Sequence, residues 1–159
     1  MAGAKGDVYL RLVGDGGNGV VDPSFYHITV QIKYPVYSRK VASIKVIADG
    51  DTLTTGDGKM YFTIPAQFAG LRISDADAVV YTPSSSGTPT FQLHNMRTDQ
   101  DILSTPITID ENEYNSYGAA VQPVINTDYD DVQAGDRIRI DCDVAGTGTK
   151  GLELEILLS

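Results

Sequence analysis

The feature that most constrains this fold is a strict alternation of apolar and polar side chains near the C-terminus. In residues 136–144 the apolar positions are Ile138, Ile140, Cys142 and Val144. In residues 152–158, leucine and isoleucine alternate with Glu153 and Glu155. Such a period of two is typical of antiparallel strands with one buried face. Because a Gly- and Thr-rich run separates the two stretches, the sequence predicts a C-terminal hairpin over residues 136–158.

Shorter segments repeat this pattern along the chain. They span residues 7–13, 25–34, 42–48, 59–65, 69–73, 76–82, 90–95, 102–110 and 121–126. Gly-, Pro-, Ser- and Asp-rich turns separate them, including a predicted loop over residues 49–58. No segment has a 3.6-residue apolar repeat, so the only helix expected is one turn within residues 111–120. About ten short strands predict an all-β, antiparallel β-sandwich of the jelly-roll type, and Pro106 indicates an edge or a bulge.

The charge of the chain is distributed unevenly. Residues 1–72 hold eight Lys and Arg against six Asp and Glu, whereas residues 73–159 hold four against fifteen. This acidic balance argues against nucleic-acid binding and against adsorption to an anionic membrane. No stretch approaches the roughly 20 apolar residues that span a bilayer, and residues 1–13 lack the apolar core of a secretory signal. We therefore expect no membrane insertion.

The single cysteine limits the covalent chemistry of the chain. Cys142 excludes an intrachain disulfide and a CxxC-type metal site. It lies on the apolar side of its predicted strand, so we interpret it as a small core residue and not as a nucleophile.

The other residues that could perform chemistry form no recognisable catalytic pattern. His27 and His94 fall on the polar sides of predicted strands, where a surface or interface role is expected. No GxSxG elbow, HExxH helix or phosphate-binding GxxxxGK[ST] loop occurs. We therefore predict no catalytic, cofactor-binding or metal-binding residues, no cofactor, and no enzymatic activity.

Two acidic loops leave alternatives open. They contribute the carboxylates of Asp49, Asp51, Asp57, Asp128, Asp130 and Asp131. Calcium prefers such oxygen ligands, but neither loop has EF-hand spacing, and solvated turns are the simpler interpretation. A carboxylate pair for glycoside hydrolysis also stays open, because its separation is spatial and not sequential. The absence of tryptophan weakens a sugar-stacking role, although nine tyrosines could partly substitute.

Three stretches carry a resemblance to a known family. They are DGDTLTTGDGKMYFTIP (49–65), DILSTPITIDENE (101–113) and DDVQAGDRIRIDCDVAGTGTKGLELEIL (130–157). In this order they resemble the segments LTTG-x-x-K-x-x-F-x-x-P, ILST-x-x-TID and I-x-ID-x-D…G-x-x-x-KGL. From about Ile44 onward the chain thus resembles a family of tailed-bacteriophage virion proteins.

The resemblance implies a jelly-roll module, commonly trimeric, that phage particles display in fibres, spikes or capsid decorations. It brings no catalytic residues. We therefore expect a non-enzymatic virion surface protein, made in the host cytoplasm, that acts as a trimeric capsid decoration (cement) protein or a short head spike or fibre. The alternative is a tail or fibre receptor-binding knob, or a carbohydrate-binding module that recognises host surface glycans. The expected partners are further copies of the chain and the major capsid protein or another virion protein.

The N-terminal part of the chain lies outside the resemblance. We divide the chain into residues 1–41, a candidate virion-docking segment, and residues 42–159, the jelly-roll module. Tyrosines supply amphipathic contact area of the kind enriched at interfaces. The candidate interface residues are Tyr26, Tyr34, Tyr37 and Tyr61.

Overall fold

The computed structural model describes residues 12–13, 27–28 and 39–159. The internal contacts of the chain divide it into two units, Met1–Ser38 and Arg39–Ser159. In the first unit, β1 (Leu12–Val13) pairs antiparallel with β2 (His27–Ile28). β1 falls inside the strand predicted over residues 7–13, and β2 falls inside the strand predicted over residues 25–34. The other residues of these two predicted strands lie outside the part of the chain that the structure describes.

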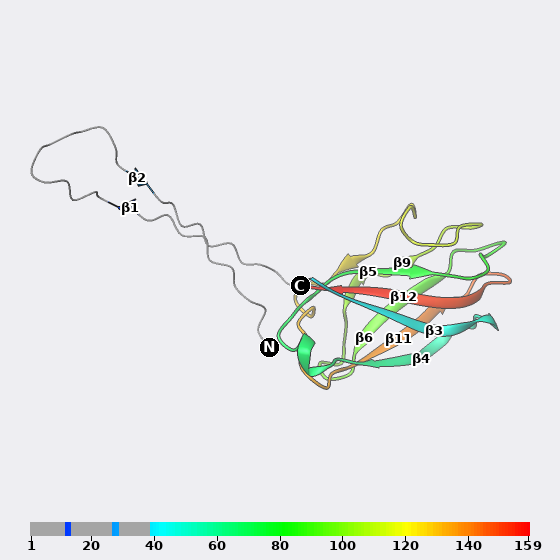
Figure 1. Cartoon of the computed structure of the whole chain (residues 1–159). Helices are drawn as coiled ribbons and strands as arrows, with labels where there is room; N and C mark the ends of the chain where they lie inside the picture. Colours follow the sequence, from blue (N-terminus) through cyan, green and yellow to red (C-terminus); the bar gives the residue numbers. More distant parts are fainter. Residues whose placement is uncertain (1–11, 14–26, 29–38) are drawn as a thin grey trace, which may run out of the picture. The chain divides into compact units, whose positions relative to one another are not determined.

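The second unit is built almost entirely from strands (Figure 1). Its elements are β3 (Lys40–Thr52), β4 (Gly56–Thr63), the 3₁₀ turn η1 (Ala66–Phe68), β5 (Ile73–Val79), β6 (Thr90–Asn95), β7 (Gln100–Asp101), β8 (Leu103–Thr105), β9 (Ile107–Thr108), β10 (Val124–Ile125), β11 (Arg137–Val144) and β12 (Lys150–Leu158). The predicted all-β class is therefore confirmed.

The two C-terminal strands do not form the predicted hairpin. β11 pairs with β4 and β6, whereas β12 pairs with β3 and β5, so each is the central strand of a different sheet. The segment between them crosses from one sheet to the other. The prediction of a hairpin was wrong because alternation specifies which face of a strand is buried, and this holds equally for strands that face each other across a core.

Each sheet is arranged around one of these strands. The orders are β3-β12-β5 in one sheet and β4-β11-β6-β7 in the other, with β9 also paired to β6. The long strands from β3 to β6 alternate between the sheets, and the late strands β11 and β12 insert between these early ones. This nested, wholly antiparallel order is that of a jelly roll. Figure 1 shows the two sheets as the layers of a sandwich.

The core lies between the inner faces of the two sheets. From β11 it receives Ile138, Ile140 and Cys142, and from β12 it receives Leu152, Leu154, Ile156 and Leu158, all almost completely buried. These are the apolar positions that the alternation assigns to the core, with Val144 alone exposed. Burial of one such side chain contributes about 1.5–3 kcal/mol, so the facing strands hold the sheets together.

Several local predictions need correction. The loop predicted over residues 49–58 is mostly strand: β3 continues to Thr52 and β4 begins at Gly56. Residues 111–120 form turns without a helix, and the helical turn is η1 instead. Pro106 lies between β8 and β9. β8 pairs with β10, whereas β9 pairs with β6. Because proline has no N–H to donate, it suits this change of partner.

Candidate functional site

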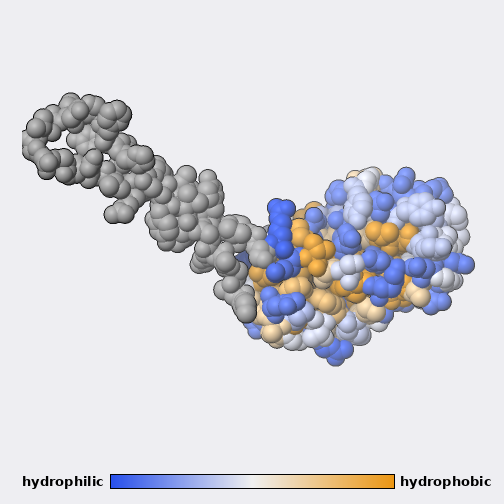
Figure 2. Space-filling model, viewed as in Figure 1, coloured by the Kyte–Doolittle hydropathy of each residue, from blue (hydrophilic) through white to orange (hydrophobic). Residues whose placement is uncertain are grey.

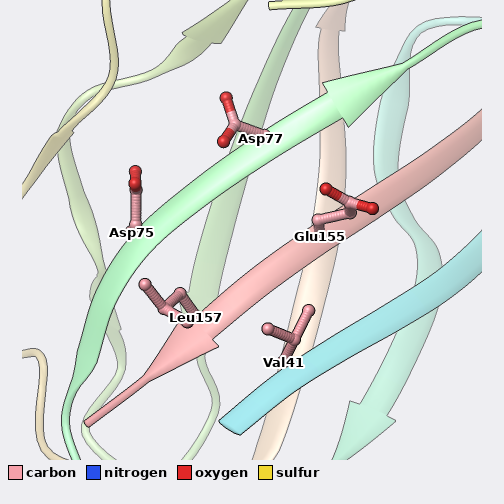
Figure 3. A pocket seen from close by; sticks show the side chains of 5 residues that line it. All are labelled: Val41, Asp75, Asp77, Glu155 and Leu157. Carbon is pink, nitrogen blue, oxygen red and sulfur yellow. The ribbon is translucent and has the colours of Figure 1, made fainter. Parts of the chain in front are cut away.

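A shallow hollow of about 170 Å³ lies on the outer face of the sheet β3-β12-β5. It is lined by Val41, Asp75, Asp77, Glu155 and Leu157. The strand register explains the grouping. Leu157 lies between Val41 and Asp75, and Glu155 lies beside Asp77, so side chains from three strands project from the same face (Figure 3). We call these five residues the acidic face.

Two of the three carboxylates of the acidic face, those of Asp77 and Glu155, accept hydrogen bonds from hydroxyl groups of residues 116 and 117. The Ser116 hydroxyl donates to Asp77 Oδ1 at 2.7 Å, and the Tyr117 hydroxyl donates to Glu155 Oε2 at 2.9 Å. Partial burial raises the pKa of Asp77, the Ser116 hydrogen bond opposes this, and the neighbouring carboxylates of Asp75 and Glu155 raise it further. Among the described residues, no Lys or Arg forms an ion pair with any of the three carboxylates. The surface thus holds concentrated negative charge that favours a cationic partner.

Apolar and aromatic side chains accompany this charge. Val41 is 64% exposed at the start of β3, and Tyr117 is 55% exposed. Tyr81 and Tyr114 are exposed as well, and the Val80 N–H donates to the Tyr114 carbonyl, which places their segments side by side. Figure 2 shows hydrophobic patches between hydrophilic ones on the surface of the sandwich. Tyrosines beside carboxylates can contribute both apolar contact and hydrogen bonds.

The outer face of the other sheet carries a different group. The Arg137 guanidinium carbon lies 4.6 Å from the centre of the Tyr61 ring, a cation–π contact. Tyr61 is 44% exposed, Arg137 is exposed, and Met96 is exposed beside them, with its N–H donating to the Arg137 carbonyl at 3.0 Å. No carboxylate of the described residues forms an ion pair with Arg137. We call Tyr61, Met96 and Arg137 the Arg137 patch.

Of the candidate interface tyrosines, only Tyr61 belongs to the described residues. Its place in the Arg137 patch leaves its ring accessible for contact. Tyr26, Tyr34 and Tyr37 lie outside the described residues. The sequence analysis did not select Tyr81, Tyr114 and Tyr117, which are more exposed than Tyr61. All three lie in bends or turns, where strand alternation does not predict which side chains face outward.

The two histidines have different outcomes. The side chain of His27 lies outside the described residues. His94 is on the polar side of β6, as predicted, but it is only 9% exposed, so the surface role is wrong, and the interface role given beside it stays a prediction. Its Nδ1 lies 2.8 Å from Asp101 Oδ1 and its Nε2 lies 3.3 Å from Asp99 Oδ1. The turn between β6 and β7 brings both carboxylates to the ring, a local contact that strand alternation does not encode.

The acidic loops considered for a cation are mostly occupied by basic side chains. Asp49 pairs with Lys45, Asp130 with Arg72, and Asp131 with Arg97. Asp57 lies 3.6 Å from Arg139. In the part of the chain that the structure describes, no group of three or more His, Cys, Asp or Glu side chains is placed to hold a metal ion. Nor does that part contain a helix long and apolar enough to cross a membrane.

The residues of the family-like stretches hold the fold together. Lys59 Nζ donates to Thr54 Oγ1 at 3.0 Å and to the Thr55 carbonyl at 2.7 Å, which closes the LTTG turn. The Gly58 N–H donates to Asp141 Oδ1 at 2.7 Å and so joins the first stretch to the third. The polar residues of these stretches thus form hydrogen bonds that close a turn and connect strands.

The comparisons with known proteins add little. No protein-family model matches the chain, and no curated protein matches it. The chain is similar to a chain in the structure of infectious bursal disease virus Gx strain, with a TM-score of 0.37 and 11% identity. The match covers 94% of this chain and 37% of that one. So loose an overlap does not inform function, and the resemblance to tailed-phage virion proteins stays a prediction from the sequence.

Proposed function

We propose that this chain is a non-enzymatic structural protein displayed on the surface of a tailed-phage virion, as a trimeric capsid decoration or a short head spike or fibre. The supporting observation is where the family-like residues lie. Lys59, Asp141 and the threonines of the LTTG turn bond to one another or to backbone groups of the sandwich. A pattern that specifies a scaffold in this way fits a protein that works through its shape and surface.

The third family-like stretch supports the same proposal. Asp130, Asp131 and Asp136 bind Arg72 or Arg97, which ties the segment before β11 to other parts of the unit. Their carboxylates are therefore committed to ion pairs. The outer sheet faces carry the exposed Tyr61 and charged side chains that form no ion pair among the described residues, and they are left as the surfaces for partners.

The test is the location of the protein on a particle. The full-length chain is added to phage particles that lack it, and the particles are imaged by electron cryomicroscopy. Density of three sandwiches per site on the head supports a decoration or head spike. Density at the tail tip would indicate a receptor-binding protein instead. The absence of added density on both the head and the tail contradicts the proposal.

Attachment is proposed to use residues 1–41. A variant without residues 1–22 is compared with the full chain for folding, trimer formation and particle binding. A folded trimer that no longer binds the particles supports a docking segment. Normal binding, or a variant that fails to fold, contradicts it.

A second candidate function is recognition of host surface glycans. Tyr117 is exposed beside the acidic face, and Tyr81 and Tyr114 are exposed elsewhere on the same unit. Tyrosine rings can stack on sugars, and carboxylates can accept hydrogen bonds from sugar hydroxyl groups. A glycan array probed with the full chain tests this candidate. Binding that Tyr117→Ala abolishes would favour it over a purely structural role.

A further inference from the structure

We propose that the free edge of β3 takes up an extended segment of a partner virion protein as an additional strand. The inference rests on the proposed virion function and deepens it by naming a contact surface and the kind of partner that fits it. The surface consists of the outer edge of residues 40–46 and the core-facing side chains of the two edge strands beside it. We call these side chains the open rim: Ala42, Ile44, Val46, Met60 and Phe62.

The outer edge of β3 has no neighbouring strand in the part of the chain that the structure describes. β3 pairs with β12 on one side, and no group of the described residues bonds to the main chain of residues 40–46 on the other. In an antiparallel pair, alternate residues direct their N–H and C=O groups toward the partner strand, so the residues between them direct theirs outward. A row of such main-chain groups is satisfied by another extended chain. The edge therefore specifies the conformation of its partner.

The opposite edge of the same sheet is already covered. Residues 114–116 lie along β5, where the Ser116 N–H donates to the Ala78 carbonyl at 3.0 Å. The core-facing Ala76 and Ala78 of β5 are at most 1% exposed, whereas the three core-facing side chains of the open rim on β3 are 7–9% exposed. The core is thus closed on the β5 side of the sandwich and less completely covered on the β3 side.

The open rim continues onto the other sheet. β4 lies on the same side of the sandwich as β3 (Figure 1), and among the described strands it pairs only with β11. Met60 and Phe62 of β4 pack against the core but are only partly buried. A strand added to β3 would direct every second side chain over this rim, because side chains alternate between the two faces of a strand. The fitting segment therefore has apolar residues at alternate positions.

A segment of another protein fits this edge better than β3 of a second copy. The register of β3 with β12 is regular only up to Lys45, after which a bulge bends the strand. Antiparallel pairing of two copies would bring Lys45 of each toward the basic start of the other, at Arg39 and Lys40. Like charges across a strand pair are destabilising, and bulges discourage pairing between folded edges. An extended segment brings neither obstacle.

The experiment measures amide hydrogen exchange in the full chain, both free and bound to phage particles that lack it. In the free chain, the outward amides of residues 40–46 should exchange quickly, and those bonded to β12 slowly. Binding should slow the outward amides by about tenfold or more, because each gains a main-chain acceptor. Unchanged exchange in the bound chain would overturn the inference and leave the virion role standing. A chain that does not bind particles would contradict both.

Side-chain variants of the full chain test the open rim by affinity for the same particles. Met60→Lys places a charge on the rim and should weaken binding by about tenfold or more, whereas Met60→Leu keeps an apolar side chain of similar size and should bind normally. Val121→Lys introduces a lysine at an exposed valine outside the rim and should also bind normally. Circular dichroism verifies that the variants fold, and the exchange measurement decides the matter if Met60→Lys does not.

Two further results would overturn the proposal. One is equal particle binding by Met60→Lys and Met60→Leu. The other is protection of the outward β3 amides that increases with the concentration of the free chain, since this would identify a second copy as the occupant of the edge.

Discussion

Arg97 donates through Nε to both carboxylate oxygens of Asp136, at 2.8 and 3.0 Å. The two residues are far apart in sequence, one in the turn after β6 and the other just before β11. Asp136 is only 5% exposed, and its Oδ2 also accepts from the Gln133 N–H at 2.9 Å and from Asn95 Nδ2 at 3.3 Å. One carboxylate therefore joins the end of β6 and the turn after it to the turn before β11.

Replacement of Asp136 by alanine should destabilise the fold strongly. The change leaves the buried Asn95 amide and the Gln133 N–H without their acceptor, and it unpairs Arg97. A loss of about 3 kcal/mol in the free energy of unfolding is expected from such a network. Urea denaturation measures it. Asp128→Ala removes an exposed aspartate nearby and should change stability by less than about 0.5 kcal/mol, and equal losses in the two variants would contradict this role.

The stabilisation from Asp136 should depend on pH. Burial by itself would raise the pKa of this carboxyl, but hydrogen bonds from Arg97, Gln133 and Asn95 outweigh burial and lower the pKa below its ordinary value of 3.8. A carboxyl whose pKa is lowered by folding stabilises the protein fully at pH values above its pKa in the unfolded chain. This stabilisation is lost as the pH falls through its pKa in the folded protein. The stability difference between wild type and Asp136→Asn should thus be constant near neutral pH and shrink below about pH 4. A difference that is unchanged down to about pH 2 would contradict this assignment.

Gly151 should not accept a side chain. Its φ is +64°, and an added Cβ would lie 2.9 Å from the Tyr81 Cβ and 3.0 Å from the Asp49 Cα. Gly151→Ala therefore combines backbone strain with overpacking and should cost about 3 kcal/mol in the free energy of unfolding. Gly148→Ala is the matched control, since its φ is +75° with nothing within 4 Å of the added Cβ. Gly148→Ala should lower the free energy of unfolding by only about 1 kcal/mol. A clearly larger loss in Gly151→Ala would then come from the contacts of its Cβ with Tyr81 and Asp49, and equal losses would contradict this explanation.

Cys142 should react with alkylating agents only when the protein unfolds. Its side chain is buried between the sheets, and burial raises the pKa of the thiol to about 11. At pH 8 the reactive thiolate is therefore scarce and enclosed. Mass spectrometry should show slow labelling by iodoacetamide in buffer and rapid labelling in concentrated urea. Fast labelling of the folded protein would indicate that the β11 region opens readily.

The sequence by itself determined the class of the fold and the burial of its strands. Alternation placed Ile138, Ile140 and Cys142 on the core side and Asp141 on the other, because side chains leave a strand in opposite directions at successive residues. The proline at position 106 indicated an edge or a bulge, because a residue without an N–H cannot donate to a strand ladder. These properties are local, so a local pattern is sufficient to predict them.

Only the tertiary structure decided which strands are neighbours and which surface side chains meet. β11 and β12 are close in sequence but lie in different sheets, because the hydrogen-bonding groups of a strand are the same whichever partner they find. The same reason hid the acidic face, where Asp77 and Glu155 meet through long-range pairing of β5 with β12. Alternation determines which direction a side chain points, but its neighbours depend on how distant segments of the chain pair.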